Sequence, residues 1–371
     1  MRVALVHDYL VQYGGAERVL EALAELFPRA PIYTLIYDKE GMGGAFADRT
    51  VHTSFLQNLP LARKNHRLFP PLMPFATENL DLSNFDLVIS SSTSYAKGVI
   101  TGSQTTHISY CHTPMRYAWE NCHRYLEQFR YSPFTKAVIP YALTYLRMWD
   151  KNSADRPDYY IANSRCVARR IRKYYAREAR VIHPPVDVAS PAQTTTEPPA
   201  SDSYYLMLGR FLPYKHYDIV IEAFKHRDEH LKIIGAGPDE AHLKHLAAGA
   251  DNIEFLGSQS DERVRAYLQH ALGFIFPSED DFGIVPVEAM AAGTPVLAYR
   301  GGGALETVEE GTTGLFFDQQ TPDSVNRTLD TFVQTTFASK EIKRHAQRFT
   351  KDLFYQRMTG LISEITQTPY R

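Results

Sequence analysis

Two cationic side chains, Arg210 and Lys215, flank a short loop with the chemistry of an anion site. The loop follows the apolar segment that begins at Tyr204, and it ends where a helical pattern over 216–225 begins. A guanidinium grips two phosphate oxygens at once, whereas an ammonium acts as a point charge. This arrangement predicts a phosphate-binding loop, with two solvated surface cations as the alternative interpretation.

Three consecutive acids, Glu279-Asp280-Asp281, end a second apolar segment and stand directly before Phe282-Gly283. A helical pattern over 284–292 follows, so the amides of this turn are expected to donate to a ligand. Glu288 lies in that pattern and can point back to the same loop. Carboxylates only accept hydrogen bonds, which suits them to vicinal hydroxyls. An acidic helix start that complements the helix dipole is the alternative.

Two further loops carry candidate ligand-binding residues. Gly14 and Gly15 follow the strand-like segment 3–9 and precede a helical pattern, so a ligand can approach the backbone closely. A tight strand-to-helix turn is the alternative. His112 ends another strand-like segment, 106–112, and the carboxyl ends of strands are where α/β sheets bind ligands. A structural histidine with satisfied hydrogen bonds is the alternative there.

The segment Gly235-Ala236-Gly237-Pro238 resembles part of a dinucleotide-binding fingerprint, but Glu240 stands where the third glycine belongs. We interpret the segment as a strand-to-helix turn. The sequence has no zinc-ligand spacing, no G-x-S-x-G elbow and no Walker loop, which argues against zinc enzymes, serine hydrolases and P-loop NTPases.

Short apolar segments alternate with helical patterns, which indicates parallel sheets covered by helices on both faces. We expect an α/β protein with one domain over 1–188, a second over 204–344, and a proline-rich linker or loop over 189–203. The C-terminal segment 345–371 is expected to return to the first domain. The expected strands are 3–9, 32–37, 85–91, 106–112, 159–164, 204–209, 231–234, 253–256, 272–276, 295–298 and 314–317, and the expected helices include 16–27, 216–225, 240–248, 261–270, 284–292 and 340–365.

Composition indicates a globular protein. The 371 residues are 44% hydrophobic and 22% charged, which excludes intrinsic disorder as the main state. The net charge of −2 gives no overall signature of nucleic-acid binding, so no nucleic-acid partner is expected. Residues 1–190 carry an excess of Lys and Arg, and residues 191–371 carry an excess of Asp and Glu. This asymmetry suggests that the two halves have different partners.

The cysteines and the N-terminus favour a cytoplasmic location. Cys111, Cys122 and Cys166 form no C-x-x-C pair, which argues against a disulfide framework and fits a reducing compartment. The N-terminal residues run into a strand-like segment without an export signal, and no apolar run approaches the length of a membrane span.

Taken in order, these loops resemble those of a retaining glycosyltransferase of family GT4, which has the GT-B fold. The resemblance covers nearly the whole chain. Its most specific part is Phe-Gly-x4-Glu-Ala-Met-Ala-x-Gly-x-Pro-Val, residues 282–296. The strings His-Asp-Tyr-x4-Gly-Gly-Ala-Glu-Arg-Val and Tyr-Cys-His-Thr-Pro-Met-Arg-Tyr resemble the branch that builds O-antigens and exopolysaccharides, which includes many mannosyltransferases. The family implies two Rossmann-like domains that face each other across a cleft.

The resemblance also implies a site for a nucleotide-diphosphate sugar donor. Arg210 and Lys215 would neutralise the diphosphate, Glu288 would hold the ribose hydroxyls, and His112 would lie near the donor sugar. The implied catalytic residues are His112, Arg210, Lys215 and Asp280. The other implied donor contacts are Gly14, Gly15, Gly257, Phe282, Gly283, Ile284 and Val285.

One position departs from the family pattern. Asp280 stands where the family has the first of two glutamates, and Glu279 is one place too early, so either carboxylate is a candidate for the sugar hydroxyls. No Asp-x-Asp metal motif is evident, because Asp280-Asp281 is expected to start a helix. Cations and helix amides stabilise charge on a departing diphosphate directly. We therefore expect a retaining, metal-independent transfer with no cofactor.

The basic first domain is expected to bind the acceptor, which the resemblance implies is lipid-linked or an oligosaccharide. Apolar residues mix with basic ones over 55–76, and aromatic residues are frequent over 125–149. We expect these segments to meet the inner face of the plasma membrane peripherally, with ordinary helix packing as the alternative. The basic candidates are Arg63, Lys64, Arg67 and Arg116.

Several alternatives remain open at this point. GDP-mannose is the favoured donor from the resemblance to the branch, and UDP-glucose follows. A sugar-nucleotide epimerase or a phosphorylase on the same architecture is another enzyme class. A two-domain sugar-binding protein is the non-catalytic alternative, although neutral sugars need no pair of cations such as Arg210 and Lys215.

Overall fold

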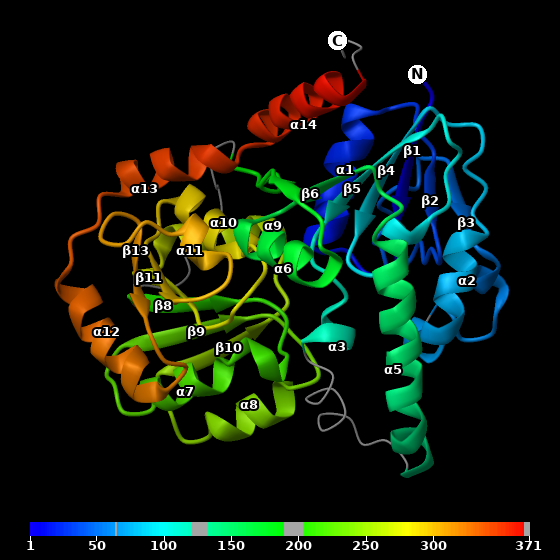
Figure 1. Ribbon diagram of the computed structural model, residues 1–371. Helices are drawn as coiled ribbons and strands as arrows, with labels where there is room; N and C mark the ends of the chain where they lie inside the picture. The colour runs from blue at the N-terminus through cyan, green and yellow to red at the C-terminus, as the bar shows by residue number, and fades with distance from the viewer. Residues whose placement is uncertain (64, 121–132, 189–202, 367–371) are drawn as a thin grey trace. The chain divides into compact units, whose positions relative to one another are not determined.

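The computed structural model describes residues 1–63, 65–120, 133–188 and 203–366 (Figure 1). The chain forms two compact units. The first is Met1–Pro185 together with the chain from Tyr355 onward, and the second is Val186–Phe354. Most of the expected linker, 189–203, lies outside the described residues, as does Cys122.

The first unit is built on a parallel sheet in the order β3-β2-β1-β4-β5-β6-β7. Each neighbouring pair is parallel, so the strands end at one common edge. Continuous apolar segments form the central strands because both faces of the sheet are buried. The strands are β1 (Val3–His7), β2 (Ile32–Thr34), β3 (Val51–Thr53), β4 (Leu87–Ser92), β5 (Thr106–Cys111), β6 (Tyr159–Ala162) and β7 (Ala179–Val181).

Helices connect these strands. The helix after β6 begins at a side-chain cap, because the Ser164 hydroxyl accepts from the Val167 amide, and it ends at Ala176 in the left-handed conformation. The α-helices are α1 (Gly15–Leu26), α2 (Met73–Glu78), α3 (Arg116–Trp119), α5 (Pro133–Ser153), α6 (Arg165–Tyr175) and α14 (Lys351–Thr366). The short 3-10 helices are η1 (Phe55–Asn58), η2 (His66–Leu68), η3 (Pro70–Leu72) and η4 (Ala96–Gly98).

The second unit contains a parallel sheet in the order β10-β9-β8-β11-β12-β13. Its strands are β8 (Tyr204–Leu208), β9 (His230–Ile234), β10 (Ile253–Gly257), β11 (Gly273–Phe276), β12 (Val296–Tyr299) and β13 (Gly314–Phe317). Its helices are η5 (Pro213–Lys215), α7 (Tyr217–Phe224), α8 (Glu240–Leu246), α9 (Asp261–His270), α10 (Ile284–Ala292), α11 (Ala304–Thr307), α12 (Pro322–Gln334), α13 (Ser339–Ala346) and η6 (Gln347–Phe349).

Alternate residues of the second sheet enter two different cores. Leu206 and Phe274 lie in one hydrophobic cluster, whereas their chain neighbours Tyr205 and Ile275 lie in the other. Successive side chains of a strand point to opposite faces, so both faces of this sheet are covered. This confirms the expected α/β class with two Rossmann-like parallel sheets.

The C-terminal segment differs in one respect from the expected helix over 340–365. It is divided into α13, η6 and α14, because Thr350 adopts an extended conformation and pairs with Val186 as an isolated bridge. The segment belongs to the first unit from Tyr355 onward, whereas the expected boundary was residue 345. The Tyr355 hydroxyl donates to Glu25 on α1, beside which α14 lies in Figure 1.

Candidate functional site

Lys215 and Asp280 come together at the carboxyl edge of the second sheet. Lys215 ends η5 after β8, and Asp280 follows β11, which pairs directly with β8. The Lys215 Nζ lies 2.5 Å from Asp280 Oδ2, and both side chains are partly buried. The rings of Tyr214 and Phe276 lie 5.8 and 6.0 Å from the same ammonium. The two predicted loops therefore form one polar site, in which Lys215 already has a carboxylate partner.

A buried tyrosine, Tyr217, lies within range of the Asp280 charge. Burial, together with the negative charge of Asp280, raises the pKa of the Tyr217 hydroxyl, so it is a neutral donor. A Cβ at Gly209, whose φ is +149°, would lie 3.0 Å from the Tyr217 oxygen. Glycine at this position therefore lets the end of β8 pass close over Tyr217.

The Gly-Ala-Gly-Pro segment supports the loop that carries Arg210. A Cβ at Gly235 would lie only 1.9 Å from the Gly209 carbonyl oxygen, and one at Gly237 would lie 2.3 Å from that of Phe211. The Phe211 amide donates to the Ala236 carbonyl at 3.0 Å. These glycines permit backbone-to-backbone packing, which confirms the interpretation as a strand-to-helix turn. Arg210 projects from the supported loop with an exposed side chain.

The start of α10 corrects one expectation. Asp280 and Asp281 do not start the helix; they lie in a loop, and the helix begins at Ile284 after Gly283. Gly283 has a φ of +82°, a conformation that glycine adopts without strain, and it reverses the chain between the acids and the helix. The buried Phe282 ring packs edge-on against Phe349. Amides in the first turn of a helix have no partner within the helix, so this end can donate to an anion.

Three glycines that the sequence analysis did not single out hold the acidic loop in place. The Gly303 amide donates to the Asp280 carbonyl at 2.8 Å. A Cβ at Gly302 would lie 2.2 Å from the same carbonyl oxygen, and one at Gly303 would lie 2.3 Å from Phe282 Cα. The Glu279 Cγ would lie 3.3 and 3.1 Å from a Cβ at Gly301 and at Gly302, so the Glu279 side chain packs against this glycine turn. The run of glycines after an apolar strand was the available signal.

The remaining second-unit candidates lie on the same elements. Glu288 is partly buried in α10, and Val285 occupies the first turn of that helix. Gly257 ends β10 with a φ of +65°, and its carbonyl accepts from the Gly235 amide at 2.9 Å. Gly257 is thus tied to the turn that supports the Arg210 loop.

In the first unit, the buried Asp8 organises the loop after β4. Its carboxylate accepts hydrogen bonds at 2.5 to 2.9 Å from the amides of Thr93, Ser94, Tyr95 and Ala96 and from the Thr93 hydroxyl. A carboxylate with this many donors is fully satisfied and fixes the loop geometry. Sequence reasoning did not single out Asp8, because its partners lie far away along the chain.

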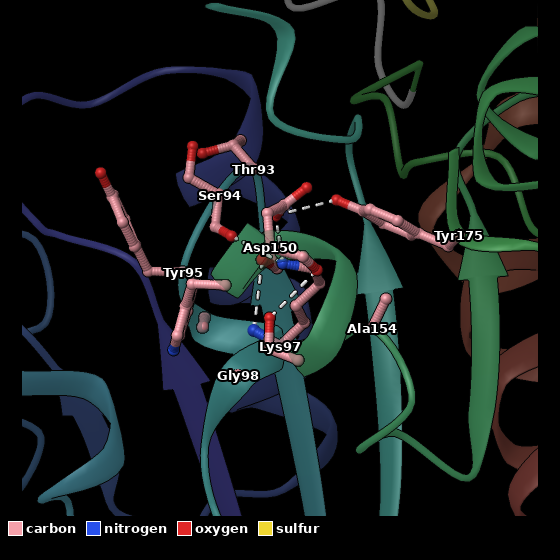
Figure 2. Close-up of polar contacts among 12 residues, drawn as sticks. Thr93, Ser94, Tyr95, Lys97, Gly98, Asp150, Ala154 and Tyr175 are labelled. Atoms are coloured by element: carbon pink, nitrogen blue, oxygen red, sulfur yellow. Dashed lines mark hydrogen bonds and ion pairs between the residues drawn. The ribbon is translucent and has the colours of Figure 1, made fainter. Parts of the chain in front are cut away.

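A buried ion pair continues this arrangement, as Figure 2 shows. The Lys97 ammonium lies 2.5 Å from Asp150 on α5 and also donates to the Ser94 carbonyl. The Tyr175 hydroxyl and the Trp119 indole donate to the same carboxylate at 3.2 and 2.7 Å. Lys97 and Asp150 are both almost completely buried. The pair therefore joins η4 to α5, α3 and α6.

His112 lies one residue beyond the end of β5 and is mostly buried. Its amide donates to the Ser92 carbonyl, and its own carbonyl accepts from the Asn163 side chain at 3.0 Å. Burial lowers the pKa of His112 to about 4. The ring is therefore neutral at pH 7, and its Nε2 lies 2.8 Å from Ser91 Oγ.

The two glycines of the first loop frame the start of α1. Gly14 is the residue before the helix, and Gly15 is its exposed first residue. A Cβ at Gly14 would lie 3.2 Å from the Glu17 carboxylate.

The predicted acceptor residues are only partly described. Arg63 is exposed, whereas Lys64 and the side chain of Arg67 lie outside the described residues. Arg116 lies 3.8 Å from Glu120, one turn later along the chain. In the described part of the chain, no helix is long and apolar enough to cross a membrane, and no group of three or more acidic, histidine or cysteine side chains is arranged to hold a metal ion.

Two protein families match adjoining parts of the chain. The family described as Glycosyltransferase Family 4 matches residues 13–190, and the family described as Glycosyl transferases group 1 matches residues 193–349. This chain belongs to these glycosyltransferases. The expectation from the sequence is thereby confirmed at the level of the glycosyltransferase family, whereas the mannosyltransferase branch and the retention of configuration stay predictions. The Lys215–Asp280 site lies in the part matched by the group 1 family.

Individual glycosyltransferases resemble parts or all of the chain. An uncharacterized glycosyltransferase of Methanocaldococcus jannaschii is 28% identical over 158 residues, 42% of this chain and 45% of that protein. The D-rhamnosyltransferase WbpZ of Pseudomonas aeruginosa is 26% identical over 231 residues, 59% of each protein. The chain thus spans about half the length of these curated relatives.

Among solved structures, Anabaena Alr3699/HepE in complex with UDP is similar with a TM-score of 0.71 and 18% identity, covering 98% of this chain and all of that one. This similarity establishes the fold, which is that of the GT-B glycosyltransferases.

Proposed function

We propose that this glycosyltransferase moves a hexosyl group from a nucleotide-diphosphate sugar to a hydroxyl acceptor, with retention of configuration and without a metal ion. The observation that carries the proposal is the meeting of three features at adjacent strand ends of the second unit. These are the cation loop with Arg210 and Lys215, the carboxylate of Asp280, and the amide-bearing start of α10.

The proposed chemistry follows the charge. The bond between the anomeric carbon and the diphosphate oxygen breaks, and negative charge develops on the departing diphosphate. Lys215, Arg210 and the first-turn amides of α10 stabilise that charge. The acceptor oxygen forms the new bond on the same face of the sugar and passes its proton to the departing phosphate. No enzyme nucleophile takes part.

The two carboxylates have separate proposed tasks. Asp280 holds Lys215 in place in the absence of donor and accepts from a sugar hydroxyl when the donor binds. Glu288, partly buried in α10, accepts from the ribose hydroxyls. His112, at the end of β5, contacts the donor sugar.

We propose GDP-mannose as the donor, with UDP-glucose as the second candidate. The motif resemblance to polysaccharide-building mannosyltransferases favours the first. The relative WbpZ, named a D-rhamnosyltransferase, agrees with transfer of a hexose-type sugar. The structural neighbour HepE was solved with UDP and with UDP-glucose, which favours the second.

We further propose a lipid-linked acceptor at a membrane surface, in polysaccharide synthesis. Exposed apolar side chains gather between η1 and α2, where Phe55 and Phe75 line a pocket of about 330 Å³. The exposed Arg63 lies in the same stretch of chain. Full activity on a water-soluble acceptor, unchanged by lipid vesicles or by Arg63→Ser, would contradict this part of the proposal.

The first experiment is a thermal-shift panel with GDP, UDP, ADP, GDP-mannose and UDP-glucose, each with and without EDTA. A ligand at 100 times its dissociation constant stabilises the folded state by about 2.7 kcal/mol. We expect a base-selective shift that survives EDTA and is lost in Arg210→Ala and in Lys215→Ala. Lys244→Ala is the matched control, because Lys244 pairs with Glu240 on the surface of α8.

A second assay separates the alternative functions. Transfer of labelled sugar to an acceptor without added phosphate distinguishes a transferase from an epimerase and from a phosphorylase. Nucleotide binding without any turnover of the donor would favour a sugar-binding protein. Loss of the thermal shift on adding EDTA would contradict the metal-independent mechanism.

A further inference from the structure

Four side chains of the first unit form a continuous polar chain that ends at His112. The Oε1 of Glu17, on α1, lies 3.3 Å from His7 Nε2, and His7 Nδ1 lies 3.1 Å from Ser91 Oγ. The same Ser91 oxygen lies 2.8 Å from His112 Nε2. Each of the four residues is at most 9% exposed, so these polar atoms must satisfy one another.

The order of donors and acceptors follows from the first member. A carboxylate only accepts hydrogen bonds, so the Nε2 of His7 that faces Glu17 carries a hydrogen. With His7 as the neutral imidazole, which has a single N–H group, its Nδ1 accepts, and the Ser91 hydroxyl donates to it. The Ser91 oxygen then has no hydrogen left for His112 and must accept from His112 Nε2–H.

We propose that Glu17, His7 and Ser91 are positioning residues that fix His112 as its Nε2–H tautomer and leave its Nδ1 as a hydrogen-bond acceptor. The lowered pKa of His112, which burial causes, keeps this ring neutral and leaves the Nδ1 lone pair available. A neutral acceptor nitrogen receives a hydroxyl and disfavours a phosphate oxygen, which itself only accepts. Resting on the proposed function, this assigns a donor-sugar hydroxyl to His112, not the diphosphate.

The backbone around the chain is held independently. The His112 amide donates to the Ser92 carbonyl at 2.8 Å, and Asn163 donates to the His112 carbonyl at 3.0 Å. At the other end, a Cβ at Gly14 would approach the Glu17 carboxylate to 3.2 Å, so glycine leaves room for this carboxylate. The tautomer, not the location of His112, is therefore what the polar chain controls.

Nitrogen NMR of histidine-labelled protein tests the proposal directly. At about pH 8 an ordinary imidazole, with a pKa of about 6.5, is neutral. We expect a protonated Nε2 and an unprotonated Nδ1 for His112. In Ser91→Ala the two His112 nitrogen shifts should move toward the average of two exchanging tautomers. Ser90→Ala is the matched control. Ser90 is next to Ser91 on β4, but its Oγ contacts His107 Nε2 at 2.9 Å, so this substitution should leave the His112 spectrum unchanged.

Two results would overturn the proposal: a protonated Nδ1 on His112 in the wild type, or an unaltered His112 spectrum in Ser91→Ala. If Ser91→Ala fails to fold, Glu17→Leu tests the other end of this series of hydrogen bonds. It should allow both His7 and His112 to exchange between tautomers. Glu17→Gln should preserve the tautomer, because its amide oxygen still accepts from His7.

The spectrum needs no substrate, so its outcome is independent of the proposed transfer reaction. Where transfer is measured, Ser91→Ala should lower kcat about tenfold, the scale of one hydrogen bond, with a smaller change in KM. An altered tautomer with unchanged kcat would overturn the assignment of a sugar hydroxyl to His112.

Discussion

Lys215 and Asp280 are 65 positions apart in the sequence, yet their charged atoms lie 2.5 Å apart across the loops that follow β8 and β11. This ion pair has a direct consequence for the proposed donor site. A bound diphosphate and the Asp280 carboxylate would compete for the same ammonium.

Replacing Asp280 should distinguish its two proposed roles, which are to hold Lys215 and to accept a hydrogen bond from a sugar hydroxyl. In Asp280→Asn, a nucleoside diphosphate should bind up to about fivefold more tightly, since a partly exposed ion pair is worth about 0–1 kcal/mol. Sugar transfer should nevertheless slow. Calorimetric titration measures the affinity, and Glu240→Gln, which releases Lys244 on α8, is the control. Weaker diphosphate binding would show that Asp280 assists the phosphates.

Gly235→Ala should destabilise the second unit strongly. The new Cβ would lie 1.9 Å from the Gly209 carbonyl oxygen, at a φ of +141°, so both a clash and backbone strain arise. Gly249→Ala is the matched control, because its φ is +84° but nothing lies within 4 Å. Backbone strain, which both variants share, costs about 1–3 kcal/mol. Gly235→Ala should lower the free energy of unfolding by more than Gly249→Ala does, because it adds the clash. Chemical unfolding compares the two, and equal losses would argue against the tight packing of these loops.

The ion pair between Lys97 and Asp150 should be critical for folding of the first unit. Asp150→Asn leaves the Lys97 ammonium buried without a counter-charge, which typically costs about 3–5 kcal/mol. Glu364→Gln breaks the exposed contact with Arg180 and should have a much smaller effect. Denaturant midpoints of the two variants measure the difference. If the denaturant midpoints of both variants fell by a similar, small amount, water would have to reach the Lys97 ammonium.

Two buried histidines should make the protein less stable in mild acid. Burial lowers the pKa of His107 to about 3 and that of His112 to about 4, from 6.5. Below about pH 6.5 the unfolded chain binds protons that the folded chain cannot, so the free energy of unfolding falls as the pH falls toward 4. Melting temperatures across this range should decline less steeply in His107→Gln. If the melting temperatures of the variant and the wild type fell equally steeply with pH, His107 would not contribute to the loss of stability in acid.

Local signals in the sequence predicted much of this structure. Apolar segments located the central strands because those strands are buried on both faces, and glycines located the turns where backbones touch. The edge strands β3 and β7 were not predicted, because neither contains a buried residue and so neither gives an apolar pattern, whereas the equally short β2 is mostly buried. The helices α6 and α12 were not predicted either, although Ser164 and Thr321 supply side-chain caps that signal their starts.

The candidate site could be predicted residue by residue but not as an arrangement. The types of Arg210 and Lys215 indicated phosphate chemistry, whereas the partnership of Lys215 with Asp280 depends on β8 and β11 being neighbours in the sheet. The same holds for the chain from Glu17 to His112, which joins α1, β1, β4 and the end of β5. Strand order is a long-range property, and no local pattern encodes it.

The division of the chain has a consequence for its synthesis. The second unit is one uninterrupted stretch, Val186–Phe354, whereas the first unit also needs the residues of α14 from Tyr355 onward. On the ribosome, the unit that begins first is therefore the last to be completed, after the other has already emerged. A fragment that ends before α14 would leave Glu25 and Arg180 without their contacts to Tyr355 and Glu364, while a fragment comprising the second unit would lack none of its own strands.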